Sequence, residues 1–120
     1  MTLKLRSAFT GLALLAAGCT QAVKPDDQLA TSEASVRTAQ ELGAQSIPPA
    51  ALELQLAMDS LGHAKDLIKA GDNEGAKYQL WRSKADADLA LALTRNSRAV
   101  AEADGAQAQL EDVKRLPPPQ

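Results

Sequence analysis

Residues 72–116 read DNEGAKYQLWRSKADADLALALTRNSRAVAEADGAQAQLEDVKRL, and this stretch decides the fold. Alanine and leucine supply most of its apolar residues, and few of its residues are β-branched or aromatic. This composition favours an α-helix and disfavours a β-sheet. Asp72 can cap the first turn, and no proline interrupts the chain before Pro117. We therefore expect one helix of about 43 residues, roughly 65 Å long.

Two shorter helices are expected before this stretch. The first spans about residues 26–43, with Asp26 or Asp27 as its N-cap. Two adjacent prolines then interrupt the helical pattern, because proline lacks an amide donor and restricts the residue before it. The second helix spans about residues 49–70, and Gly71 ends it. The chain is therefore expected to form three helices separated by short turns.

Both later helices carry apolar residues at alternating spacings of three and four, which is typical of helices that pack at a shallow angle. Most of these residues are small, so the helix axes can approach closely, although each residue buries little apolar area. The predicted seam of the second helix consists of Leu54, Ala57, Leu61, Ala64 and Ile68. The predicted seam of the long helix consists of Ala85, Leu89, Ala92, Asn96, Ala99, Ala103, Ala106, Leu110 and Val113.

The helix lengths allow two all-α architectures. The favoured one is an antiparallel three-helix bundle with a long C-terminal helix, whose last residues, about 20 of them, have no partner within the chain. The alternative is a proline-kinked long helical hairpin, in which the first two helices run end to end. The helical phase continues from Ile47 through Ala50 to Leu54 and permits the hairpin, whereas the double proline argues against it.

The overhanging part of the long helix is a candidate for binding a partner. In the bundle it would expose a seam that includes Ala99, Ala103, Leu110 and Val113. A helix of another protein or a second copy of this chain would have to cover that seam. We therefore expect self-association or a helical partner.

Tyr78 and Trp81 lie near the start of the same helix and have two interpretations. They either close the end of the bundle against Leu67 and Ile68, or they bind a partner. Partner binding is considered because Trp and Tyr dominate many protein interfaces.

The composition argues against several other functions. The 120-residue chain has one cysteine, one histidine and a net charge of −2, and 2% of its residues are aromatic. Neither nucleic acid nor a multi-cysteine metal site is therefore expected. Asp86 and Asp88 diverge on a helix and are expected to form surface pairs with Arg82 and Lys84, while His63 is expected to be exposed. Because no nucleophile, phosphate-loop or zinc motif occurs, we expect neither enzymatic activity nor a cofactor.

The start of the chain has the pattern of a secretory leader. Lys4 and Arg6 form a positive segment, and residues 8–17 are mostly apolar. This apolar run is too short for a membrane-spanning helix, which needs about 20 residues. It ends in Leu-Ala-Ala-Gly-Cys at residues 15–19, which resembles the lipobox of bacterial lipoproteins. The alternative is an ordinary signal peptide beside an unmodified thiol at Cys19.

The lipobox resemblance implies cleavage between Gly18 and Cys19, a diacylglycerol on the Cys19 thiol and an acyl chain on its new amino group. Two or three acyl chains anchor a protein far more firmly than one. Thr20 stands where aspartate would imply the inner membrane, so the resemblance implies an outer-membrane protein that faces the periplasm. The predicted organisation is a signal peptide at 1–18, an acylated tether at 19–25, a helical domain at 26–116 and an extended tail at 117–120.

A second resemblance covers the stretch from Ala34 to Leu93. Its elements are Pro49, the run Leu61 to Lys69, Ala70-Gly71-Asp72, Glu74 to Ala76, and Ala85-Asp86-Ala87-Asp88-Leu89-Ala90. This order resembles the bacterial envelope family known as domain of unknown function 4398. Members are secreted proteins or lipoproteins, and some carry an OmpA-like domain that binds peptidoglycan. The residues after Pro117 are too few for such a domain, so the resemblance does not imply wall binding.

Two functions therefore remain open. The favoured one is a structural or adaptor lipoprotein, whose acyl chains fix one end in the outer membrane while its helices contact another protein in the periplasm. The alternative is a module of the cell envelope that binds a small ligand or a peptide between its helices.

Overall fold

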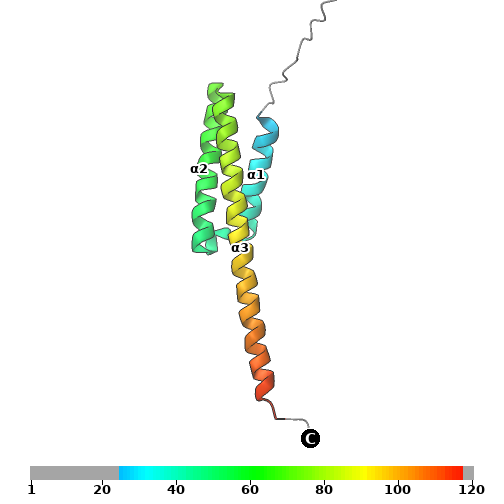
Figure 1. The fold of residues 1–120 in the computed structure, drawn as a ribbon. Helices are drawn as coiled ribbons and strands as arrows, with labels where there is room; N and C mark the ends of the chain where they lie inside the picture. The colour runs from blue at the N-terminus through cyan, green and yellow to red at the C-terminus, as the bar shows by residue number, and fades with distance from the viewer. Residues whose placement is uncertain (1–24, 118–120) are drawn as a thin grey trace, which may run out of the picture.

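A computed structural model describes residues 25–117, and Figure 1 shows it as a ribbon. The described residues form three α-helices and one short 3-10 helix, and none of them lies in a strand. The elements are α1 (Asp26–Glu41), η1 (Ala44–Ser46), α2 (Pro48–Ala70) and α3 (Asn73–Arg115). The predicted signal peptide, Cys19 and most of the predicted tether and tail lie outside the described residues.

The three helices form an antiparallel bundle in which α1 and α3 run in one direction and α2 in the other (Figure 1). α3 packs against both other helices, and α1 also contacts α2. The all-α three-helix bundle with a long C-terminal helix is therefore confirmed. The alternative of a long helical hairpin is wrong, because α2 folds back beside α1 and does not extend it.

The connection between α1 and α2 explains this reversal. Gly43 has a left-handed φ of 77°, which glycine adopts without the steric cost of a Cβ atom. Ile47 is extended, as residues before proline tend to be. Pro48 then occupies the first turn of α2, where its missing amide hydrogen is not needed. The two prolines therefore start a new helix in a new direction.

The start of α1 differs from the prediction. Pro25 is the N-cap, and its carbonyl oxygen accepts a hydrogen bond of 2.7 Å from the Leu29 amide. Asp26 and Asp27 both lie inside the first turn, and no side chain caps the helix. The prediction that one of them is the cap is therefore wrong. Their carboxylates instead lie near the positive end of the helix dipole, which favours negative charge.

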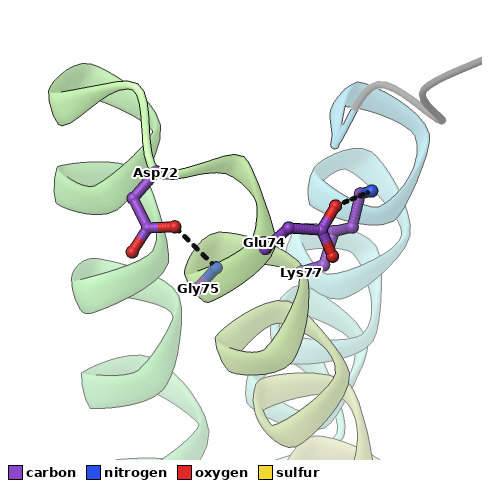
Figure 2. Close-up of polar contacts among 4 residues, drawn as sticks. All are labelled: Asp72, Glu74, Gly75 and Lys77. Carbon is purple, nitrogen blue, oxygen red and sulfur yellow. Dashed lines mark hydrogen bonds and ion pairs between the residues drawn. The ribbon is translucent and has the colours of Figure 1, made fainter.

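The turn between α2 and α3 agrees with the prediction. Gly71 has a φ of 81°, and its amide donates to the Ile68 carbonyl oxygen at 3.0 Å. A carboxylate oxygen of Asp72 accepts a hydrogen bond of 2.9 Å from the Gly75 amide, as Figure 2 shows. The same view shows the ion pair between Glu74 and Lys77, at 2.6 Å. Gly71 thus ends α2 and Asp72 caps α3.

The core between the helices is built mainly from alanine, so it is thin. The larger buried apolar side chains are Val36, Leu54 and Leu80. The buried alanines are Ala39, Ala44, Ala50, Ala57, Ala64, Ala76, Ala87 and Ala90. The predicted seam of α2 is confirmed as its inward face, because Leu54, Ala57 and Ala64 are buried and the other two members are partly buried. Small residues let the helices pack closely but bury little area each.

Candidate functional site

The two sides of α3 carry the same alternating spacing but differ in exposure. Its inward face consists of Ala76, Leu80, Ser83, Ala87, Ala90 and Thr94, all of which are buried. The seam predicted from the sequence is two residues out of phase with this face, a rotation of about 200° around the helix. Its bundle part, Ala85, Leu89, Ala92 and Asn96, is exposed, so the prediction that this part packs inside the bundle is wrong, whereas its overhanging part from Ala99 to Val113 is exposed as predicted. We call this exposed face the outward stripe: Ala85, Leu89, Ala92, Asn96, Ala99, Ala103, Ala106, Leu110 and Val113.

Buried hydroxyl groups explain why the inward face was missed. Ser83 donates a hydrogen bond of 2.8 Å to the carbonyl oxygen of Ala57 in α2. Ser32 of α1 donates one of 2.9 Å to the carbonyl oxygen of Leu80. A buried hydroxyl with a partner avoids most of the cost of leaving water. Serine and threonine can therefore occupy core positions that an apolar count assigns to the surface.

α3 extends well beyond the other two helices. Every residue from 98 to 117 is exposed, which confirms the predicted overhang. The helical part of the overhang, residues 98–115, is about 27 Å long. Its larger apolar side chains are strongly exposed: Val100 by 52%, Leu110 by 59% and Val113 by 67%. Leu89, which is 46% exposed, continues the outward stripe onto the bundle.

Arg98 fixes α3 where it leaves the bundle. Its Nη2 atom donates a hydrogen bond to the carbonyl oxygen of Leu42, at the C-terminal end of α1. The last carbonyl groups of a helix have no partner within that helix, and the negative end of its dipole favours a cation. This contact could not be predicted from the sequence, because the two residues are 56 positions apart and no local pattern links them.

Arg95 and Glu102 flank the outward stripe on one edge, seven residues apart and therefore on the same side of the helix. Both side chains are exposed. Neither forms an ion pair with another described residue. Arg95 and Glu102 thus give this edge of the stripe a positive and a negative group that are both able to pair with a bound helix.

Tyr78 and Trp81 do not close the end of the bundle. Tyr78 is 60% exposed and Trp81 is 68% exposed, so the interpretation that they pack against Leu67 and Ile68 is wrong. Trp81 lines a cavity of about 220 Å³ between α1 and α3, together with residues that include Leu80. The two aromatic rings are therefore available to a partner protein. They lie on α3, the helix that also carries the outward stripe.

The polar groups of the bundle lie mainly at its surface. The predicted surface pairs are confirmed, with Lys84 and Asp88 joined at 2.5 Å and Arg82 and Asp86 at 3.8 Å. His63 is exposed, as predicted. Over residues 25–117, no group of three or more His, Cys, Asp or Glu side chains could hold a metal ion. Within the same range, no helix combines the length and the apolar character needed to cross a membrane.

Comparison with known proteins gives one match. No curated protein and no solved structure matches the chain. The model of the family described as Domain of unknown function (DUF4398) matches residues 27–108, from the first turn of α1 to well inside the overhang of α3. This range covers more than half of the chain and includes the stretch in which the sequence resembles that family. The chain therefore belongs to the DUF4398 family.

Proposed function

We propose that this protein is an outer-membrane lipoprotein that acts as a non-catalytic structural or adaptor bundle in the periplasm. The observation that carries the adaptor role is the outward stripe of α3, which stays exposed from Ala85 to Val113. A stable helix gains most of its stability from burying an apolar face. An apolar stripe that residues 25–117 leave uncovered is therefore suited to contact another protein.

The positions of the two ends support this role. α1 begins at Asp26, and the overhang of α3 ends at the opposite end of the bundle (Figure 1). Cys19 precedes Asp26 by seven residues, which span at most about 25 Å when extended. Acyl chains on Cys19 would hold the α1 end of the bundle near the membrane. The overhang could then contact a protein away from that attachment point.

Binding of a small ligand between the helices has less support than binding of a protein partner. The cavity beside Trp81 has a volume of about 220 Å³. A second hollow of about 480 Å³ is lined mainly by exposed side chains, Gln40, Gln45, Gln55 and Met58, which would not enclose a ligand. Sites for small molecules usually have volumes of about 300–1,000 Å³ and enclose most of the ligand. The outward stripe is the larger feature, so a protein partner is favoured over a small molecule.

The anchor is tested by replacing Cys19 with Ser. The variant cannot carry a thioether-linked diacylglycerol, so it should leave the membrane fraction and appear as a soluble protein or an uncut precursor. Fractionation of cells followed by mass spectrometry of the N-terminus measures both outcomes. Unchanged membrane attachment of the variant would contradict the lipoprotein assignment.

The adaptor surface is tested by placing two charges on the outward stripe, with Ala99→Asp and Ala103→Asp in one chain. The matched control carries Ala101→Asp and Ala108→Asp, which lie on the opposite side of the same overhang and are also exposed. Buried carboxylates strongly disfavour a helix–helix contact. Binding or self-association should fall at least tenfold in the first variant only, with circular dichroism unchanged in both. Equal effects of the two variants would contradict a stripe-specific contact.

A further inference from the structure

The overhang of α3 carries only part of the outward stripe. Its outward stripe continues onto the bundle, where Ala85, Leu89 and Ala92 are also exposed. One bound helix could therefore cover both parts of the stripe only if it were longer than the overhang. An antiparallel second copy of α3 has the required length and places overhang against bundle in both copies.

We propose that the occupant of the outward stripe is α3 of a second copy, paired antiparallel with Ala92 of one copy opposite Ala103 of the other. This inference takes from the proposed function that the stripe is a protein-binding surface, and it names the partner. The paired segments run from Ala85 to Leu110, a length of about 38 Å. Each overhang then packs against the part of α3 that lies in the bundle of the other copy. The two α1 ends point in opposite directions, so a dimer with both copies anchored through Cys19 lies along the membrane surface.

The sizes of the stripe residues fit this register. Leu89 lies opposite Ala106 of the second copy, and Leu110 lies opposite Ala85. A large side chain thus meets a small one in both of these layers, and no layer sets leucine opposite leucine. Asn96 lies next to the two-fold axis, opposite Ala99 and one layer from Asn96 of the second copy.

The charges beside the stripe select the same register. Arg95 of each copy lies beside Glu102 of the other, so these two exposed side chains, neither of which has an ion partner among the described residues, pair twice. On the other edge, Leu93 lies beside Val100. Asp86 and Asp88 lie beside Gln107 and Gln109, so like charges do not meet.

Other pairings fit less well. A shift by one heptad in one direction places Glu102 beside Glu102 of the second copy, and a shift in the other places Arg95 beside Arg95. Like charges across a helix interface oppose pairing. A parallel pairing in register sets Arg95 beside Val100 and stacks leucine on leucine and alanine on alanine. The antiparallel register therefore satisfies both the size pattern and the charges.

Cysteine crosslinking of the full chain tests this register. Two differently tagged copies are produced together in cells, one with Ala92→Cys and one with Ala103→Cys. After mild oxidation of the membranes, we expect a disulfide-linked dimer that carries both tags. The chain without added cysteines reports any background from Cys19.

Three outcomes would overturn the inference. Dimers from Ala103→Cys alone would indicate parallel pairing, and preferential linkage of Ala103→Cys to Ala106→Cys would indicate pairing of the overhangs only. Absence of a disulfide-linked dimer in every combination would exclude a second copy as the occupant. The Cys19→Ser fractionation and the loss of binding in the Ala99 and Ala103 variant test the proposed function independently of these results.

A charge exchange provides a second test. Arg95→Glu or Glu102→Arg alone places like charges together and should weaken self-association roughly tenfold. The two substitutions in one chain restore opposite charges and should restore the affinity. Asp104→Arg, on the side away from the stripe, serves as the control. Sedimentation equilibrium of the purified full chain in detergent measures the dissociation constant, and a double variant as weak as the single ones would contradict the pairing.

Discussion

Ser83 and Thr94 help to set which face of α3 turns inward. Ser83 bonds across to the Ala57 carbonyl oxygen, and Thr94 bonds back to the Ala90 carbonyl oxygen at 2.8 Å. Both hydroxyls are therefore satisfied without water. From the sequence, the phase of α3 could not be chosen correctly, because alanine occurs at heptad spacing on both faces and Leu89 lies on the outer one. The inward assignment depends on partners from α1 and α2, which only the fold brings together.

Two leucines of α3 allow this assignment to be measured. Leu80 is fully buried, so Leu80→Ala should lower the free energy of unfolding by about 2–5 kcal/mol. Leu89 is 46% exposed, so Leu89→Ala should lower it by less than about 1 kcal/mol. Urea denaturation of the two variants compares them, at a protein concentration low enough to keep the chain monomeric. Equal losses, or a larger loss for Leu89→Ala, would mean that the wrong face has been assigned to the core.

The ends of the helices were more predictable than their faces. Proline, glycine and an N-capping aspartate act through local backbone geometry, which is why Pro48, Gly71 and Asp72 mark the element boundaries. The start of α1 was less predictable, since Asp26 and Asp27 are equally good caps and the backbone places Pro25 there instead. The length of α3 and its overhang also followed from the sequence, because no proline occurs before residue 117.

In a single copy of the chain, the overhang should be the least stable part of α3, because its apolar side chains do not pack against other described residues. Gly105 lies in its middle, and a Cβ atom there would meet nothing within 4 Å. Gly105→Ala should therefore slow amide hydrogen exchange in the overhang roughly fivefold, from a gain of about 1 kcal/mol in helix stability.

Gly62→Ala is the matched control for this change, since Gly62 lies inside α2 and is equally open. It should stabilise the bundle and leave exchange in the overhang unchanged. Exchange rates of individual amides, followed by mass spectrometry or NMR, separate the two effects. Unchanged exchange in the overhang of Gly105→Ala would contradict the view that this segment opens locally as a helix.

At the scale of the whole molecule, the chain separates two tasks along one long helix. The first part of α3 completes the bundle with α1 and α2, and the remaining part projects past them (Figure 1). The sequence predicted the residues of the partner-binding candidate in the overhang, which the structure leaves exposed. It did not predict that the same stripe stays exposed along the bundle, nor that Arg98 fastens α3 to the end of α1. These features depend on how the three helices are rotated against one another.

The most direct test of the outward stripe uses a photocrosslinking amino acid in living cells. Ala106 lies on the stripe, and Ala108 lies two residues further along on the opposite side, so the pair differs mainly in the direction of the side chain. Crosslinking from position 106 should give a discrete protein adduct in the envelope fraction, and crosslinking from position 108 should give little or none. Adducts of equal yield at both positions, or none at position 106, would contradict the claim that α3 contacts a protein through this face.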